Sequence, residues 1–219
     1  MFIGHAAVAL ASRPLAPRVN LAVPLAAAFW LDLVWPVLLA LGIERAEIAP
    51  GDTAFTPLHF THYPWSHSLA AALVWSALFG MACLRRYGRR AALLMGALVL
   101  SHWLLDAISH RPDLPLWPGG ARLVGLGLWN SVPATLAVEG AMFAAGVWLY
   151  VRAAPARDRT GALAFWGLIA LLVAAYLGNV FGPPPPGMPA VAAAGLLGSA
   201  IILALAAWAD RHRGAPAPA

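Results

Sequence analysis

His102 and Asp106 have the spacing in this chain that best suits chemistry. They lie four residues apart in an apolar run at 91–110. On a helix, this spacing places both side chains on one face, where they can hold one metal ion between them. The same spacing also suits a buried hydrogen bond that fixes two helices together. His110 continues this face, but its position at the end of the run favours a helix-capping role.

Three more ionisable residues interrupt apolar stretches, namely His5, Asp32 and Glu139. A charged side chain inside a bilayer is costly, so a membrane segment keeps one where it is paired, hydrated or bound to a metal. A rise of about 1.5 Å per residue along each helix places these three in one layer with His102 and Asp106. Glu139 would there be a metal ligand, a general base or a partner of a histidine.

The segment HYPWSHS at 62–68 adds two histidines, one on each side of a proline turn. His62 and His67 precede the next apolar run, and imidazoles at a helix entrance suit a metal ion. The rise per residue places His67 above the layer, so it joins the layer only where its helix tilts or dips inward. His62 is equally well explained as a solvated residue at the membrane interface, and His59 as an ordinary loop residue.

These side chains offer nitrogen and oxygen donors without a thiolate. Such a set suits Zn²⁺, with Mn²⁺ or Fe²⁺ as the other options, and two ions would fit. A bound ion lowers the pKa of its water towards about 7, which is how such sites hydrolyse esters and phosphoesters. The single cysteine, Cys83, has no partner for a disulfide or a cysteine-rich metal site.

The composition indicates a membrane protein. Of the 219 residues, 61% are hydrophobic and only 11% are charged, well below the share of charged residues in soluble proteins. The net charge is +5, but no basic stripe with interleaved aromatic residues is present, which argues against nucleic-acid binding. Membrane lipids are therefore the expected surroundings.

Long apolar runs predict an all-α bundle of about six membrane-spanning helices. Each run is close to the roughly 20 residues needed to cross a bilayer. The first twelve residues are too short to cross and predict a half-helix that enters the bilayer or lies along it. We expect one membrane domain, 1–219, with the motifs in 1–113 and additional helices in 130–209. The predicted spans are 20–43, 67–85, 91–110, 130–152, 161–182 and 187–209.

Arginine placement predicts the orientation, because arginine-rich loops stay cytoplasmic. Both termini are then cytoplasmic. The four arginine clusters that would share the cytoplasmic side are Arg13 with Arg18, RRYGRR at 85–90, the group Arg152, Arg157 and Arg159, and Arg211 with Arg213.

The motifs resemble one known family. Gly4-His5, Asp32, His62 with His67-Ser68, and Ser101-His102 with Asp106 are similar to the motif series of the membrane-bound metal-dependent hydrolases, also described as LexA-binding, inner-membrane-associated hydrolase-like proteins. The matches cover about the first 110 residues. The resemblance implies a zinc site with five ligands, His5, Asp32, His67, His102 and Asp106, and less securely His62.

The chain departs from the family pattern at two places. Leu31 stands where the family has a proline before the aspartate, and Tyr63-Pro64-Trp65-Ser66 stands where it has Arg-Gly-x-Thr. The missing arginine would have suited an anionic substrate, and Arg111 is a candidate to replace it.

Three functions follow from these observations. The first is a metal-dependent hydrolase of a lipid-like or other small amphiphilic ester or phosphoester, in which Glu139 or His62 moves protons. The second is a transporter or ion-conducting protein that uses the same polar layer as a pathway. The third is a structural membrane protein whose polar residues only hydrogen-bond between helices.

Overall fold

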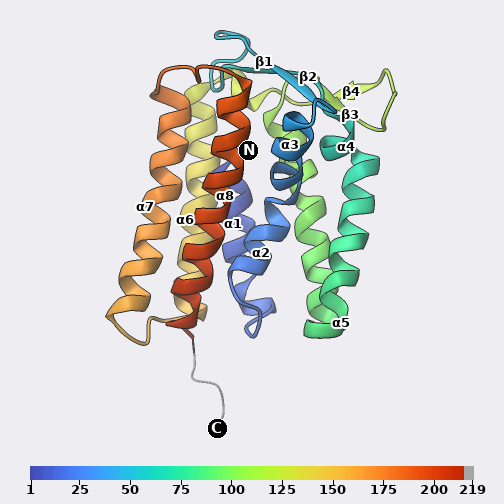
Figure 1. Ribbon diagram of the computed structural model, residues 1–219. Helices are drawn as coiled ribbons and strands as arrows, with labels where there is room; N and C mark the ends of the chain where they lie inside the picture. Colours follow the sequence, from blue (N-terminus) through green and yellow to red (C-terminus); the bar gives the residue numbers. More distant parts are fainter. Residues whose placement is uncertain (215–219) are drawn as a thin grey trace.

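The computed structural model describes residues 1–214, which form a helical bundle capped at one end by two small sheets (Figure 1). The structure is mainly helical, so the expected helical fold class is confirmed. The helices are α1 (Ile3–Ala11), α2 (Ala22–Ala28), α3 (Trp30–Ala40), α4 (Pro64–His67), α5 (Leu69–Ser109), α6 (Val132–Ala153), α7 (Arg159–Phe181) and α8 (Met188–Arg211), with 3-10 turns at Arg13–Leu15 and Leu128–Asn130.

The two sheets are additions to the expected all-α architecture. Strands β1 (Arg45–Ile48) and β2 (Leu58–His62) pair antiparallel, with Ile48 opposite Leu58. Strands β3 (Leu114–Pro115) and β4 (Leu123–Val124) form the second antiparallel pair. Both pairs lie in connections between helices, where short strands leave little periodicity in the sequence to predict them.

Four helices, α5 to α8, are long and apolar enough to cross a membrane, and the bent pair α2 and α3 makes a fifth candidate. Helix α5 itself folds back at Gly88, whose φ of 79° lies in the left-handed region that glycine tolerates. Its two arms then run side by side, and the Ser76 hydroxyl of one arm donates a hydrogen bond of 2.7 Å to the Gly96 carbonyl of the other. The two arms correspond to the predicted spans 67–85 and 91–110.

The first predicted span is broken. Helices α2 and α3 meet at Phe29 with a bend of 62°. Pro36 lies inside α3, and the helix continues past it. The break at Phe29 instead leaves the end of α2 without helical continuation, and Asp32 follows in the first turn of α3.

Helix α1 lies inside the bundle, surrounded by the longer helices (Figure 1). It packs closely against α6 because Gly146 has no side chain: a Cβ there would come within 2.5 Å of the Ala7 carbonyl oxygen. The additional helices are thus part of the core around α1 rather than a separate layer.

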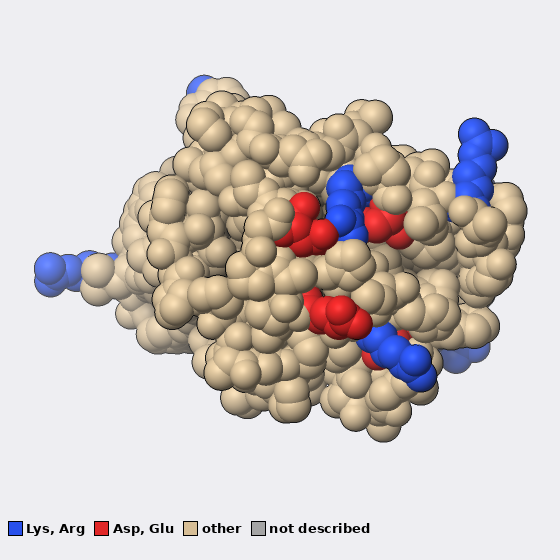
Figure 2. Space-filling view, turned by 90° about the horizontal axis from the view of Figure 1, so that it is seen from above, with Lys and Arg blue, Asp and Glu red and all other residues tan. Residues whose placement is uncertain are grey.

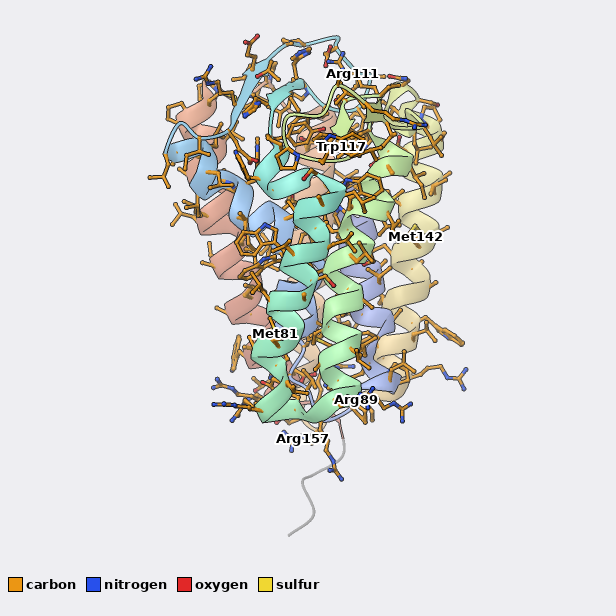
Figure 3. The ribbon with its side chains drawn as sticks, turned by 90° about the vertical axis from the view of Figure 1, so that its right-hand side faces the viewer. Met81, Arg89, Arg111, Trp117, Met142 and Arg157 are labelled. Atoms are coloured by element: carbon orange, nitrogen blue, oxygen red, sulfur yellow. The ribbon has the colours of Figure 1, made fainter. Side chains whose placement is uncertain are left out.

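The end of the bundle that carries Arg89 and Arg157, called the arginine-bearing end below, lies opposite the end that carries the sheets. Figure 3 shows Arg89 and Arg157 at one end, with Arg111 and Trp117 at the other. Arg13 at this end is buried, although the sequence suggested a surface position, and its guanidinium donates to the Asp210 carboxylate at 3.0 Å. The opposite face, seen in Figure 2, carries acidic and basic side chains next to one another within a largely uncharged surface.

Candidate metal centre

Five predicted ligands converge inside the bundle from four separate helices: His5 of α1, Asp32 of α3, His67 of α4, and His102 with Asp106 of α5. Four of the five are buried. Asp32 is the exception, because its side chain is 37% exposed. The height offset expected for His67 is removed because α4 ends just before α5 begins and carries His67 towards the other ligands.

The donor atoms lie at distances that suit one shared ion. Nε2 of His102 is 3.1 Å from Oδ2 of Asp106 and 3.7 Å from Oδ1 of Asp32. Nε2 of His67 is 3.5 Å from the same Asp32 oxygen and 3.8 Å from Oδ2 of Asp106. In a tetrahedral zinc site with bonds of about 2.0–2.2 Å, neighbouring donor atoms are roughly 3.3–3.6 Å apart. These four distances are close to that spacing, and the donor atoms that all lie within 4.8 Å of one another form two sets of three: Asp32, His67 and His102, and His5, His102 and Asp106.

The hydrogen bond at the far side of the His102 ring leaves the metal-facing nitrogen free. Nδ1 of His102 lies 2.7 Å from the carbonyl oxygen of Ala28, the last residue of α2. A carbonyl oxygen only accepts, so Nδ1 carries the proton and Nε2 keeps its lone pair. Nε2 is buried and forms no hydrogen bond with any residue of the described range 1–214. A lone pair facing carboxylate oxygens in a buried place fits a bound cation.

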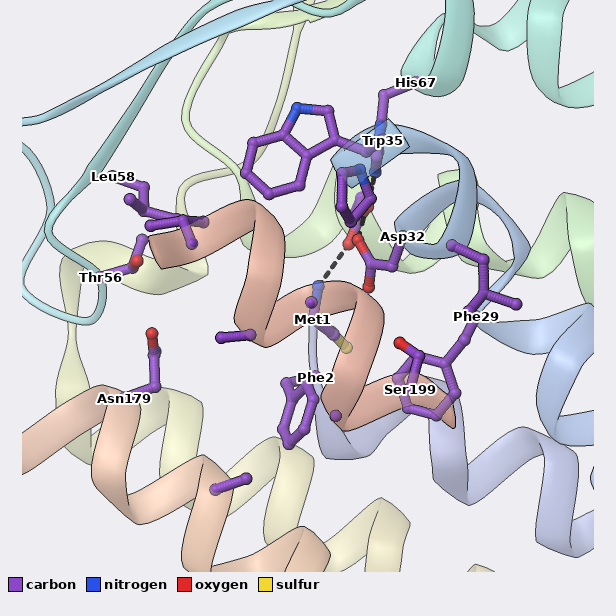
Figure 4. A pocket seen from close by; sticks show the side chains of 18 of the residues that line it. Met1, Phe2, Phe29, Asp32, Trp35, Thr56, Leu58, His67, Asn179 and Ser199 are labelled. Atoms are coloured by element: carbon purple, nitrogen blue, oxygen red, sulfur yellow. Dashed lines mark hydrogen bonds and ion pairs between the residues drawn. The ribbon is translucent and has the colours of Figure 1, made fainter. Parts of the chain in front are cut away.

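His67 is oriented in the same way by a longer chain of contacts. The Ser66 hydroxyl lies 2.6 Å from Oε2 of Glu44, to which it donates, and 2.7 Å from Nδ1 of His67. The hydroxyl proton is used on the carboxylate, so the Ser66 oxygen accepts the proton of His67 Nδ1. The other Glu44 oxygen accepts the backbone N–H groups of Trp65 and Ser66, each at 2.8 Å. These contacts leave Nε2 of His67 without a hydrogen bond to any residue that the structure describes and turned towards Asp32; Figure 4 shows the two side chains.

His5 approaches the cluster from the other side of Asp106. Its ring stacks on that of His102 with centroids 3.7 Å apart, and its Nε2 lies 3.1 Å from Oδ1 of Asp106. The amino group of Met1 pairs with the same oxygen. The two oxygens of Asp106 thus face different partners.

Beside the cluster lies a cavity of about 370 Å³, a size typical of small-molecule sites. Asp32, His67 and Asp106 reach its wall, while most of the remaining lining is apolar and comes from α3, α7, α8 and the segment 55–60. Helix α8 approaches α3 closely at Gly195, where a Cβ would lie 2.8 Å from the Pro36 ring.

Glu139, a predicted catalytic residue, contacts the backbone of α1. Its Oε2 accepts the N–H groups of Phe2 and Gly4 at 2.9 and 3.0 Å. It therefore satisfies the otherwise unpaired donors at the start of α1 and fixes the turn that carries His5. Its Oε1 is buried without a hydrogen-bond partner among residues 1–214, so a proton-carrying role stays a prediction.

His62, the second predicted catalytic residue, lies outside the cluster. It is exposed at the end of β2 and lines a separate polar cavity on the capped end of the bundle. Arg111 lines that cavity too, and its guanidinium pairs with Asp52 and, at 3.4 Å, with Asp113. The arginine proposed as a substitute for the missing family arginine is therefore already paired with carboxylates, and it does not line the cavity beside the cluster.

His110 ends α5, as its position in the sequence suggested. It is the C-terminal cap residue, and its Nδ1 lies 3.0 Å from Oδ1 of Asp113. Ser68 caps the start of α5, because its hydroxyl accepts the N–H of Ala71 at 3.1 Å.

No family model, characterised protein or solved structure matches the chain. The geometry of the site therefore carries the functional argument.

Sequence reasoning missed Glu44 and gave Ser66 no part in the metal site. Ser66 had a signal, since it directly precedes His67. Glu44 lies 22 residues earlier, outside the apolar runs, and only the fold brings its carboxylate to Ser66.

Proposed function

We propose that this protein is a membrane-embedded, metal-dependent hydrolase acting on a small amphiphilic ester or phosphoester. The observation that carries the proposal is the pair of bare histidine nitrogens, Nε2 of His67 and His102, facing two carboxylates at the edge of a mainly apolar cavity. The resemblance to the membrane-bound metal-dependent hydrolases agrees with this reading.

Zn²⁺ is the metal we propose, held by Asp32, His67 and His102 with Asp106 beside them, and Mn²⁺ or Fe²⁺ are the alternatives. His5 would complete the site or, together with Asp106, hold a second ion. When bound, the metal would polarise the scissile group and make water acidic enough to act as a nucleophile.

The protein's own groups then have separate tasks. Ser66 with Glu44, and the Ala28 carbonyl, hold the two imidazoles in their ligating orientation. Asp32, the ligand that remains partly exposed, faces the cavity and can take up a proton there. The apolar walls bind the hydrophobic part of the substrate and exclude water from the reacting group.

We further propose that the chain crosses the inner membrane of a bacterium six times: once with α2 and α3 together, twice with the two arms of α5, and once each with α6, α7 and α8. The arginine-bearing end would be cytoplasmic, as would both termini. The metal cluster and its cavity would then open towards the outer leaflet, from which an amphiphile can enter.

Metal analysis tests the proposal. Elemental mass spectrometry on detergent-purified protein should find zinc or another divalent metal in stoichiometric amount. The metal should be lost in a His102→Ala/Asp106→Ala variant and kept in His59→Ala, a control that removes a histidine from outside the cluster. The metal-loaded protein should hydrolyse short-chain amphiphilic esters or phosphoesters, and chelation should abolish turnover. A folded wild type that binds no divalent metal would contradict the proposal.

One observation favours a second candidate, a transporter. The polar cluster lies next to a helix broken at Phe29, and broken helices at polar residues are typical of transport pathways. Proton or metal flux into proteoliposomes that is lost in Asp32→Asn, without any hydrolysis, would favour this candidate. A purely structural role predicts a metal-free core, which the same metal analysis tests.

A further inference from the structure

The cavity beside the metal cluster has a second polar end. Thr56 and Asn179 both line it, and Figure 4 places them on the side away from Asp32 and His67. Thr56 belongs to the connection between β1 and β2, and Asn179 lies in the last turns of α7. These two polar residues come from segments that no sequence motif connects.

Hydrogen bonds of its backbone hold Thr56 in place, and its side-chain hydroxyl takes part in none of them. Its N–H donates to the Thr53 hydroxyl at 3.1 Å, and that hydroxyl donates to the Thr56 carbonyl at 3.0 Å. The neighbouring residue Phe55 is anchored by a hydrogen bond of 3.1 Å from its N–H to the Trp129 carbonyl. Only 6% of Thr56 is exposed, yet its hydroxyl has no hydrogen-bond partner within residues 1–214. An unpaired hydroxyl on an otherwise buried residue, open only at a cavity wall, points to a ligand.

Apart from Ser199, the lining between the two polar ends is apolar. Leu58, Val191 and Leu203 are among the residues that form it. The ionisable side chains of the wall, Asp32, His67, Asp106 and His110, come from other segments than Thr56 and Asn179. A hydroxyl and an amide both donate and accept, so they suit an uncharged polar group.

We propose that the ligand of this cavity is polar at both ends: a metal-binding head, a hydrophobic middle, and an uncharged hydroxyl or amide that Thr56 and Asn179 bind. This inference rests on the proposed function for the head group only. It excludes a simple alkyl ester as the best substrate, because an alkyl end would leave the Thr56 hydroxyl unpaired.

Two probe pairs test the inference on the full-length protein in detergent. The first pair is an alkyl hydroxamate, whose head chelates metals, and the same hydroxamate with a terminal hydroxyl, compared over a series of chain lengths. We expect the hydroxyl-ended probe to bind wild type about fivefold more tightly at the best length, the effect of one added hydrogen bond. Thr56→Val/Asn179→Leu should abolish or reverse this preference, and Thr56→Ser should retain it.

Thr61→Val is the matched control, since Thr61 lies on β2 and lines the other cavity. The second probe pair needs no metal: a long-chain alcohol and the corresponding diol with a hydroxyl at each end. Preference for the diol without hydroxamate binding would overturn the metal-dependent function and leave the second polar site standing. Equal affinity of wild type for both members of each pair would overturn the inference, as would an unchanged preference in the folded double variant.

Discussion

Replacing Ser66 by alanine should weaken metal binding without removing any ligand. The Ser66 hydroxyl is buried and links Glu44 to Nδ1 of His67 through contacts of 2.6 and 2.7 Å. The substitution leaves the Nδ1–H of His67 without its acceptor in a place that water does not reach. The imidazole is then free to turn or to move its proton to Nε2, the nitrogen that should bind the metal.

The size of the effect follows from these contacts. Loss of a partner for one buried donor costs about 1–3 kcal/mol. Loss of the hydrogen bond behind a ligating histidine typically lowers metal affinity by about 10–100-fold, which corresponds to roughly 1.4–2.8 kcal/mol. The two estimates of the lost free energy of metal binding agree. Both assume that the metal-bound state requires the imidazole orientation that Ser66 provides.

The assay is competition for zinc between the purified protein and a chromophoric chelator. Ser66→Ala should shift the zinc affinity by the stated factor, and Ser66→Thr should restore it because threonine keeps the hydroxyl. Ser76→Ala is the control, since it removes a hydroxyl that bonds the Gly96 carbonyl away from the cluster. If Ser66→Ala and Ser76→Ala bound zinc as tightly as wild type, the assignment of His67 as an oriented ligand would be refuted.

Three further predictions concern the packing and the ends of the helices. Gly146→Ala should lower stability in detergent by about 1–3 kcal/mol because its Cβ would meet the backbone of α1, whereas Gly140→Ala, with no atom within 4 Å, should not; equal melting temperatures would contradict the close packing of α1. The pKa of Asp158 is lowered from its ordinary value of 3.8, mainly by the hydrogen bond from His212. Stability from this carboxylate is therefore present above pH 3.8 and is lost as the pH falls through the lowered pKa, so Asp158→Asn should flatten the acid side of the melting profile. Glu139→Gln keeps an acceptor for the first turn of α1 but removes its charge, so it should retain zinc binding; loss of turnover with zinc retained would indicate a proton-carrying role, and unchanged turnover would exclude it.

The helical class followed from local patterns, and the resemblance to a known family supplied the set of five candidate ligands. Apolar runs of membrane-spanning length and ionisable residues inside them are visible in one dimension, because both depend on the cost of placing charge in a bilayer. The pair His102 and Asp106 needed only the helical repeat to be placed on one face. Those inferences did not depend on how the helices pack.

Only the tertiary structure decided how these residues meet. The break at Phe29 frees the carbonyl of Ala28 for His102, and the loop before α4 brings Glu44 to Ser66. Hydrogen-bond partners of this kind lie 22 to 74 residues apart in the chain and leave no periodic signal. For the same reason, only the family resemblance ranked His67, which joins the cluster, above His62, which does not: their positions depend on a turn and a short helix, and long-range packing fixes both.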